Sequence, residues 1–360
     1  MKILHVVGAR PNFMKAAAVM RAFSRRGLTQ SLVHTGQHYD GNMSDIFFQQ
    51  LDLPTPDVNL GVGSGTHVAQ TAEIMLRLEA VLTERSPDLV IVYGDVNSTV
   101  AGALVASKLR IPVAHVEAGL RSYDRSMPEE VNRVLTDSIA DLLFTPSSDA
   151  NENLLREGID PTAIHLVGNV MVDTLVSLLP RATRPAGIPD RYALVTMHRP
   201  SNVDDLPWLT QMLITLRDIS RHLPVLFPVH PRTRQKMASI GWDDTGDRPL
   251  RLLDPMPYLG FLRLQRYATL VITDSGGIQE ETTFLGVPCL TVRDNTERPV
   301  TVSLGTNIVI GRDMGVLKRE VNKIVLGHVK EGTSVPLWDG HAAERIADVI
   351  AGKTAIAASA

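Results

Sequence analysis

Short apolar runs alternate with longer amphipathic runs along almost the whole chain. A short apolar run bounded by turn residues is typical of a buried strand, whereas an amphipathic run of about ten or more residues is typical of a helix. Their regular alternation predicts the α/β class, with parallel sheets covered by helices on both faces. The expected strands are residues 3–7, 32–34, 89–93, 113–115, 142–144, 164–166, 192–197, 225–228, 250–253, 270–273, 289–292 and 307–310.

A proline-rich break at residues 183–189 interrupts this alternation and separates two similar halves. Such a break is typical of a connection between domains, so we expect two doubly wound, Rossmann-like domains. We place the first at residues 1–168, the second at residues 169–345, and a helix end with a frayed tail at residues 346–360. In such an arrangement a ligand is expected between the domains, at the carboxyl ends of the strands.

Composition narrows the class of protein further. The chain has 360 residues, 44% of them hydrophobic, and a formal net charge of −3, which gives no electrostatic reason to expect nucleic acid or a membrane surface as a partner. A single cysteine, Cys289, excludes an internal disulfide and fits a reducing compartment. No charged-then-apolar leader pattern is present, so we expect a cytoplasmic protein.

The segment after the expected strand 270–273 has the pattern of an anion site. Ser275, Gly276 and Gly277 form a tight turn into a helix, where unpaired backbone N–H groups and the helix dipole both favour negative charge. Glu281 follows one turn later, and its acceptor oxygens suit sugar hydroxyls. The pattern predicts a nucleoside diphosphate. The alternative is an ordinary turn in which Asp274 and Ser275 cap the helix.

A second connection of this kind follows the first expected strand. Gly8 allows a tight exit from that strand, and Pro11 is well placed to open a helix. Arg10 and Lys15 stand near the start of that helix, where cations are favourable only beside an anion. The alternative for Lys15 is a solvated surface lysine. The segment is neither a P-loop nor a dinucleotide fingerprint.

Three acidic residues follow strands of the first half or open its next helix. Asp95 and Glu117 come after neighbouring strands, and Glu129 opens a helix. Neighbouring parallel strands bring Asp95 and Glu117 close together, and paired carboxylates in unequal environments commonly supply a general acid and a general base. Each also has a structural alternative: a helix cap for Asp95, an ion pair with Arg121 for Glu117 and a first-turn charge for Glu129.

Candidate groups of the second half are histidines and one arginine. His198 follows a strand and can carry a proton or contact a phosphate, whereas His230 can equally be structural. No pair of histidines has metal-ligand spacing, so we expect no metal. Arg298 can hold a pyrophosphate with its planar charge, and its alternative is a surface salt bridge.

Taken together, these motifs resemble the non-hydrolysing UDP-N-acetylglucosamine 2-epimerases over nearly the whole chain. The resemblance is carried, in chain order, by GARP with Lys15, HVEAGLR at 115–121, PEE at 128–130, His198-Arg199, TDSGGIQEE at 273–281 and TERP at 296–299. It implies a fold like that of GT-B glycosyltransferases, a homodimer, and interconversion of UDP-GlcNAc and UDP-ManNAc without NAD or another cofactor. The implied mechanism is anti elimination of UDP to a 2-acetamidoglucal, followed by re-addition.

The resemblance also implies roles for individual residues. It assigns proton handling to three carboxylates with His198 near the phosphates, and phosphate binding to Arg10 and the Ser-Gly-Gly turn. Lys15 would support the carboxylates or the phosphates. Glu281 would hold the ribose, Phe261 the uracil neighbourhood and Arg298 the rim of the active site. The proton-handling carboxylates are Asp95, Glu117 and Glu129.

Two departures leave the exact substrate open. Pro200 follows His198-Arg199 where many bacterial members have another arginine and a glutamate. The segments QHYD at 37–40 and HPR at 230–232 look like the branch that epimerises UDP-2,3-diacetamido-uronic acids, whereas Glu297-Arg298-Pro299 looks like the GlcNAc type. We favour UDP-GlcNAc. The alternatives are the diacetamido-uronic acid and a GT-B glycosyltransferase, which uses the same nucleotide site but needs an acceptor.

Overall fold

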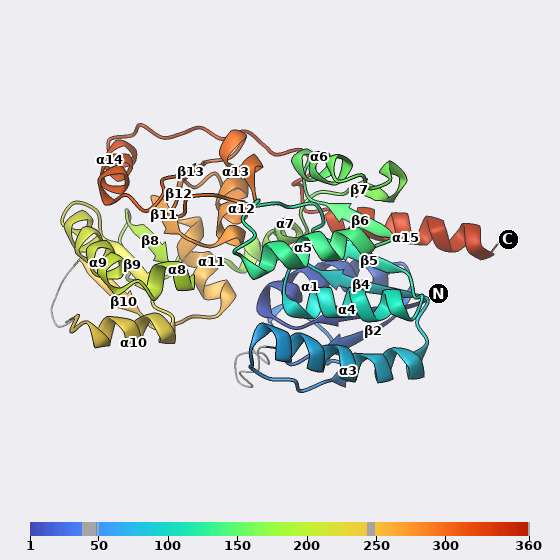
Figure 1. The fold of residues 1–360 in the computed structure, drawn as a ribbon. Coiled ribbons are helices and arrows are strands. Elements are labelled where there is room, and N and C mark those ends of the chain that lie inside the picture. The colour runs from blue at the N-terminus through green and yellow to red at the C-terminus, as the bar shows by residue number, and fades with distance from the viewer. Residues whose placement is uncertain (38–47, 49, 243–248, 359–360) are drawn as a thin grey trace. The chain divides into compact units, whose positions relative to one another are not determined.

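The computed structural model describes residues 1–37, 48, 50–242 and 249–358. It divides the chain into two compact units (Figure 1). The first unit comprises Met1–Ser177 together with Pro336–Ala360, and the second comprises Leu178–Val335. Each contains a parallel sheet with helices between successive strands, as the alternation predicted.

The sheet of the first unit has seven strands within the described residues, in the order β3-β2-β1-β4-β5-β6-β7. All of its pairings are parallel. The order reverses direction after β1, so right-handed crossovers place α1 and α4 on opposite faces. The strands are β1 (Lys2–Val7), β2 (Thr29–His34), β3 (Val58–Asn59), β4 (Leu89–Tyr93), β5 (Val113–Val116), β6 (Leu142–Thr145) and β7 (Ile164–Leu166).

Helices cover both faces of this sheet, so its central strand is buried on both sides. Every residue of β4 is buried, which is why the strand reads as an unbroken apolar run. α3, α4 and α5 pack in sequence, and α1 packs against α15. The helices are α1 (Arg10–Arg25), α3 (His67–Arg85), α4 (Asn97–Lys108), α5 (Pro128–Ile139), α6 (Ser148–Arg156), α7 (Val170–Leu178) and α15 (Ala342–Ala358), with a 3₁₀ turn at Pro161–Ala163.

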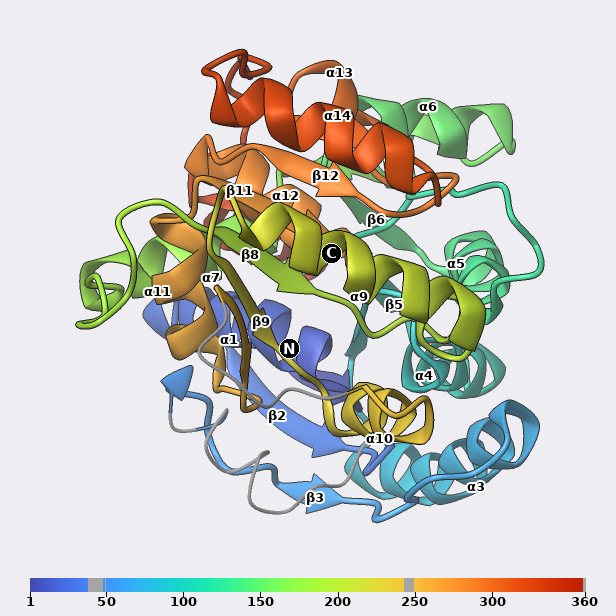
Figure 2. The same ribbon diagram turned by 90° about the vertical axis from the view of Figure 1, so that its left-hand side faces the viewer.

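The second unit repeats this plan with six strands within the described residues, in the order β10-β9-β8-β11-β12-β13. The strands are β8 (Ala193–Thr196), β9 (Val225–Pro228), β10 (Leu250–Leu253), β11 (Leu270–Thr273), β12 (Cys289–Thr291) and β13 (Asn307–Val309). The helices are α8 (Pro200–Val203), α9 (Leu206–Ser220), α10 (Pro231–Ser239), α11 (Tyr258–Arg266), α12 (Gly276–Leu285), α13 (Pro299–Ser303) and α14 (Met314–Val325), with a 3₁₀ turn at Leu179–Arg181. α9 packs against β9 and α14 (Figure 2).

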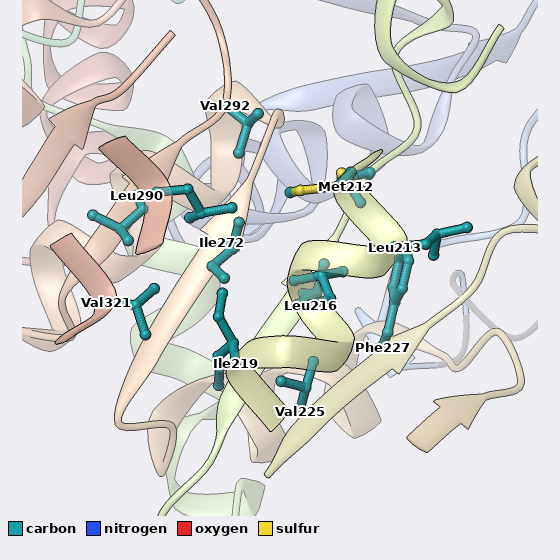
Figure 3. Packing of buried hydrophobic residues seen from close by; sticks show 14 of the residues in the cluster. Met212, Leu213, Leu216, Ile219, Val225, Phe227, Ile272, Leu290, Val292 and Val321 are labelled. Atoms are coloured by element: carbon teal, nitrogen blue, oxygen red, sulfur yellow. The ribbon is translucent and has the colours of Figure 1, made fainter. Parts of the chain in front are cut away.

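The larger core of the second unit lies between its sheet and the helices α9 and α14 (Figure 3). Met212, Leu216 and Ile219 project from α9 at helical spacing toward Ile272 and Leu290 of the sheet. This periodic burial fixes which face of α9 meets the strands. The carboxyl ends of β8 and β11, where His198 and Ser275 follow, are thereby held on a rigid support.

The observed units differ from the predicted ranges of 1–168, 169–345 and 346–360. α7 lies almost entirely in the first unit, because Thr174 Oγ1 donates to the carbonyl of Met14 in α1. The C-terminal segment also returns to the first unit, where Arg26 Nη2 lies 2.6 Å from Asp348 Oδ1. The tail predicted to fray is helical through Ala358.

The expected strands are otherwise present, with end differences of at most a few residues. β3 was not predicted, because two residues form no apolar run. No helix in the described part of the chain is long and apolar enough to cross a membrane.

Candidate active site

Two of the predicted carboxylates follow neighbouring strands of the first unit. Tyr93 of β4 pairs with Val116 of β5, so Asp95 and Glu117 leave the same sheet edge from adjacent strands. Glu117 has φ of 75°, a left-handed conformation that is rare for a residue with a side chain. Backbone strain of this kind is concentrated at functional sites, where the surrounding structure holds it in place.

Glu117 is paired with Lys15 in the interior of the first unit. Lys15 Nζ donates to Glu117 Oε2, and both side chains are almost fully buried. Gly94, with φ of 62°, makes room for the pair: a Cβ there would lie 2.8 Å from Lys15 Nζ and 3.1 Å from Glu117 Oε2. The alternative of a solvated surface lysine is therefore wrong for Lys15. The alternative of an ion pair with Arg121 is also wrong for Glu117, because Arg121 pairs with Asp137 and Glu157.

Asp95 is oriented by an arginine of α5. Its Oδ2 accepts from Arg133 Nη2 at 2.6 Å and from Nε at 3.0 Å, while its side chain stays 24% exposed. Two charge-assisted bonds to the same oxygen anchor Oδ2, and the exposed fraction of the side chain leaves the carboxylate accessible to a ligand. Asp95 does not cap α4, whose N-cap is Val96.

Glu129 and Glu130 begin the same helix but have different environments. Glu129 lies in the first turn of α5 and is half-buried. Glu130 is buried, with Oε1 accepting from the Tyr123 N–H at 2.8 Å and Oε2 from Arg133 Nη1 at 2.7 Å. Glu130 thus fixes the loop before α5, and Glu129 keeps the position of a candidate proton-transfer group.

A buried polar cluster beneath these carboxylates was not predicted. His115 Nδ1 lies 2.6 Å from Asp137 Oδ1, and Arg121 Nη1 lies 2.7 Å from Asp137 Oδ2. Burial alone would raise the pKa of Asp137, but His115 and Arg121 together hold it below its usual range. The available signal was His115 itself, a polar residue in an apolar strand two positions before Glu117.

The start of α1 carries the other predicted phosphate ligand of the first unit. Arg10 is its first residue and is half-buried, and Pro11 lies in the first turn as expected. The N–H groups of Gly8 and Ala9 both donate to Asn12 Oδ1 at 3.2 Å. Asn12 therefore occupies the amides of Gly8 and Ala9, and Arg10 is the cation at the start of this helix.

In the second unit, the predicted anion site lies at the N-terminus of α12. Ser275 is the N-cap without a side-chain capping bond, and Gly276 and Gly277 form the first turn. A Cβ on Gly276 would lie 2.3 Å from Arg298 Nη1, so only glycine lets the guanidinium come this close. The helix start thus combines backbone N–H groups with a nearby cation, an arrangement suited to phosphate.

Asp274 holds the histidine segment beside this helix and caps nothing. It is fully buried, and its oxygens accept from the N–H groups of His198 and Arg199 and from Asn202 Nδ2 at 3.0–3.2 Å. His198 Nδ1 also lies 3.2 Å from Asp274 Oδ1, and the His198 side chain is 50% exposed. Its ring is therefore anchored at one nitrogen and accessible to a ligand.

Arg298 is buried in an ion cluster that joins α12 to α13. Its Nε lies 2.8 Å from Glu280 Oε1 and its Nη1 lies 2.6 Å from Glu297 Oε1. Arg293 Nη2 contacts the other oxygen of Glu297 at 2.8 Å. The alternative of a surface salt bridge is therefore wrong, and Arg298 is held firmly beside Gly276.

Glu281 is the buried carboxyl predicted to hold a ribose. Tyr258 Oη donates to its Oε1 at 2.9 Å. Burial, with a smaller contribution from Glu280, raises the pKa of Glu281 to about 7, although hydrogen bonds from Tyr258 and Gln265 oppose the change. Phe261 lies on α11, one turn after Tyr258, and packs partly buried against the smaller core.

The remaining candidates have structural roles. His230 is the N-cap of α10 and accepts from the Arg232 N–H, as its structural alternative predicted. Cys289 is buried, and burial raises its pKa to about 11, which makes it an inert core residue.

In the described parts of the chain no group of three or more His, Cys, Asp or Glu side chains is arranged to hold a metal. Residues 38–40 of the QHYD segment lie outside the described residues.

Two Rossmann-like units, one rich in positioned carboxylates and one with a helix N-terminus suited to phosphate, define the GT-B-like class of α/β proteins. A glycosyltransferase of kitacinnamycin, 13% identical with a TM-score of 0.57 over 98% of each chain, shares this fold and nothing further can be concluded from it. The sequence model of the UDP-N-acetylglucosamine 2-epimerase family matches residues 21–351. The chain belongs to this family of isomerases.

Two relatives are similar along nearly their whole length. The structure of the Methanocaldococcus jannaschii UDP-GlcNAc 2-epimerase in complex with UDP-GlcNAc and UDP is 42% identical, with a TM-score of 0.91 over 98% of this chain and 100% of that one. The UDP-2,3-diacetamido-2,3-dideoxy-D-glucuronate 2-epimerase of Pseudomonas aeruginosa is 43% identical over 98% of this chain and 99% of the relative. Overall identity therefore does not separate the two substrates.

Proposed function

We propose that this protein interconverts UDP-GlcNAc and UDP-ManNAc by anti elimination of UDP and its re-addition to a 2-acetamidoglucal. The observation that supports this most strongly is the group of carboxylates at one sheet edge of the first unit. Asp95 is oriented by Arg133, Glu117 is paired with Lys15, and Glu129 stands in the first turn of α5. Removal of the C2 proton and its return on the other face require an acid and a base of this kind.

The leaving group is handled by residues of the second unit and by Arg10. Backbone N–H groups of Gly276 and Gly277 stabilise the phosphates, because unpaired amides and the helix dipole favour anions. Ser275 contributes its hydroxyl, since its own N–H donates to Thr273 Oγ1 at 3.0 Å. His198, anchored through Nδ1 by Asp274, assists near the phosphates with its accessible edge. Glu281 accepts from the ribose hydroxyls, Phe261 contributes to the uracil neighbourhood, and Arg298 supports the phosphate turn.

The reaction balances without an external oxidant or cofactor. The C2–H and C1–O bonds break: the proton passes to a carboxylate, the C2–H electron pair becomes the C1=C2 double bond of the glycal, and the C1–O pair leaves with UDP. A proton delivered to the opposite face of C2 and attack of UDP at C1 then form the epimer. The acid and base roles are shared among Asp95, Glu117 and Glu129. Epimerisation in either direction needs one group that removes the C2 proton and one that delivers a proton to the opposite face.

Incubation of the purified protein with UDP-GlcNAc alone in D2O, followed by NMR, tests this function. The expected product is UDP-ManNAc carrying deuterium at C2. Free ManNAc would indicate a hydrolysing epimerase, and release of UDP only when an acceptor is added would indicate a glycosyltransferase. An unchanged substrate would contradict the proposal for this sugar.

UDP-2,3-diacetamido-2,3-dideoxy-glucuronate is the second candidate substrate, supported by the Pseudomonas aeruginosa relative of 43% identity. The two sugars differ at C3 and C6, where the uronic acid adds an acetamido group and a carboxylate. Parallel measurement of kcat/KM for both sugars separates the candidates. A higher kcat/KM for UDP-GlcNAc supports the first assignment, and a large excess for the uronate overturns it.

We also propose that the protein acts as a cytoplasmic homodimer and supplies a precursor for cell-surface polysaccharide. The support is the resemblance to the family together with the single cysteine, which suits a reducing compartment. Light scattering at working concentration is expected to give twice the chain mass of 39.4 kDa. A mass of one chain would contradict the dimer and leave the reaction untouched.

A further inference from the structure

His115 lies at the centre of the first unit with both ring nitrogens bonded. The side chain is fully buried in β5. Nδ1 lies 2.6 Å from Asp137 Oδ1, and Nε2 lies 2.7 Å from the carbonyl oxygen of Gly94. The contact with Gly94 lies at the short end of the usual N–H···O range of about 2.7–3.2 Å, and the contact with Asp137 is shorter still.

The two partners determine where the hydrogens of the ring must be. A carbonyl oxygen can only accept, so Nε2 carries a hydrogen that it donates to Gly94. Asp137 is held ionised independently of the ring, because its Oδ2 lies 2.7 Å from the guanidinium nitrogen Nη1 of Arg121 and accepts from the Gly119 N–H at 3.0 Å. A carboxylate also only accepts, so Nδ1 carries a hydrogen as well. The hydrogen-bond geometry therefore requires a doubly protonated, positively charged ring.

The same cluster touches the backbone of every segment that carries a proposed proton-transfer group. Gly94 immediately precedes Asp95. Asp137 Oδ2 accepts from the N–H of Gly119 at 3.0 Å, two residues after Glu117. Asp137 itself belongs to α5, the helix whose first turn contains Glu129.

We propose that His115 is a positioning residue: as a buried imidazolium bridging Asp137 and Gly94, it fixes the spacing of the three carboxylates that move the C2 proton. This inference rests on the proposed epimerase function for its catalytic consequence. The charge of the ring and its two bonds are properties of the folded chain alone. His115 acts through the backbone and touches no reacting atom.

Two substitutions separate the two bonds of the ring. In His115→Asn the amide nitrogen takes the place of Nδ1, which keeps the bond to Asp137 and loses the bond to Gly94. In His115→Gln it takes the place of Nε2, which keeps the bond to Gly94. Because misplacement by about 1 Å can cost on the order of 10²-fold in rate, we expect His115→Asn to lower kcat by about that factor. His115→Gln should recover part of it.

His5 provides a matched control in the same sheet. It is also fully buried, with Nδ1 2.7 Å from Tyr93 Oη and Nε2 3.1 Å from Gln30 Oε1. Both partners can adapt to a neutral ring, and burial lowers the His5 pKa to about 3. His5→Gln should therefore lower thermal stability and leave kcat at the wild-type value.

The test combines kinetics with NMR on the full-length protein. For His115→Asn we expect reduced kcat and slower deuterium entry at C2, with unchanged affinity for UDP, since the UDP-binding residues of the second unit are intact. Two results would overturn the positioning role. One is a folded His115→Asn variant with wild-type kcat. The other is a loss of kcat in His115→Asn that is no larger than the loss in His5→Gln when the two variants lose the same stability.

Nitrogen-15 NMR of histidine-labelled wild-type protein reads the ring directly, with the His115 signal assigned by its loss in His115→Gln. Two protonated nitrogens at neutral pH are expected for His115 and one for His5. A single protonated nitrogen at His115 would overturn the inference even if the variants fail to fold. Failure of the wild-type protein to epimerise any UDP-sugar would instead contradict the proposed function, and the ring measurement would stand apart from it.

Discussion

Glu281 and Asp274 are buried carboxyls of one strand–helix connection, yet their environments shift the two pKa values in opposite directions. Burial raises the pKa of Glu281 from 4.5 to about 7, although hydrogen bonds from Tyr258 and Gln265 oppose the change. Burial also acts to raise the pKa of Asp274, but hydrogen bonds from His198, the Arg199 N–H and Asn202 lower that pKa below its ordinary value of 3.8. The fold thus disfavours the charged form of one carboxyl and favours the charged form of the other.

We predict that Glu281→Gln stabilises the protein at alkaline pH. The folded-state pKa is raised, so Glu281 costs stability progressively as the pH rises from 4.5 through about 7. The glutamine removes a cost on the order of 3 kcal/mol at pH 8 and almost none at pH 4. Denaturant unfolding at both pH values measures this. The same variant should bind UDP more weakly, because a charged acceptor for the ribose is lost.

Asp274→Asn is the control of opposite sign. Its pKa is lowered in the fold, so the carboxylate stabilises at neutral pH and that stability is lost as the pH falls through the folded-state pKa. Asn should therefore destabilise at neutral pH. An equal response of both variants to pH would contradict the environments described for these carboxyls.

A substitution at Gly94 tests whether the buried Lys15–Glu117 pair matters for turnover. Gly94→Ala places a Cβ 2.8 Å from Lys15 Nζ in a backbone with φ of 62°, whereas Gly158, with φ of 82°, has no atom within 4 Å of the added Cβ. Both substitutions should cost about 1–2 kcal/mol through backbone strain. Only Gly94→Ala should also reduce kcat, because it displaces Lys15 and Glu117. Equal kcat in the two variants would show that the pair is not needed for turnover.

At the scale of elements, the ion cluster of Arg298 joins α12 to α13. Arg298→Ala removes the Arg298 ion pairs of the buried Glu280 and Glu297, of which Glu297 keeps Arg293, and should destabilise the protein by about 3–5 kcal/mol. Arg312→Ala, which removes a part-exposed pair with Asp205, should cost about 0–1 kcal/mol. Equilibrium unfolding compares them. A loss of UDP affinity in Arg298→Ala without loss of stability would instead assign the guanidinium to the ligand.

The elements themselves were largely predictable, because buried parallel strands are recorded in the sequence as unbroken apolar runs. β4 is the clearest case, with every residue of Leu89–Tyr93 buried. β3 escaped prediction because two strand residues leave no pattern. The return of α15 to the first unit also escaped, since helical periodicity shows that a face is apolar and not which surface it will cover.

The candidate residues were predictable by position, and their partners were not. Glu117 follows a strand and was expected to lie at the sheet edge, but its contact with Lys15 spans 102 positions of the chain. Asp137 was overlooked, and the alternative given for Asp274 was a helix cap, because sequence spacing does not report which donors surround a side chain. Such contacts arise only when distant segments fold together.

For the whole molecule, we propose that the first unit carries out proton transfer and that the second makes most of the contacts with UDP. Asp95→Asn, Glu117→Gln and Glu129→Gln should each lower kcat by about 10²–10⁴-fold, the usual range for a lost acid–base group. UDP affinity, measured by calorimetry, should stay near the wild-type value in all three. Weak UDP binding with normal kcat would reverse the assignment.

The central claim is that UDP leaves the sugar and returns, and positional isotope exchange tests it most directly. UDP-GlcNAc is prepared with oxygen-18 in the bridge between C1 and the β-phosphorus, and equilibrated with the enzyme. If the C1–O bond breaks, rotation of the free β-phosphate distributes the label into the non-bridging positions, and phosphorus-31 NMR detects it. We predict this scrambling of oxygen-18 together with deuterium entry at C2. Deuterium entry with oxygen-18 retained in the bridge would show that the C1–O bond stays intact, and would contradict the proposed elimination of UDP.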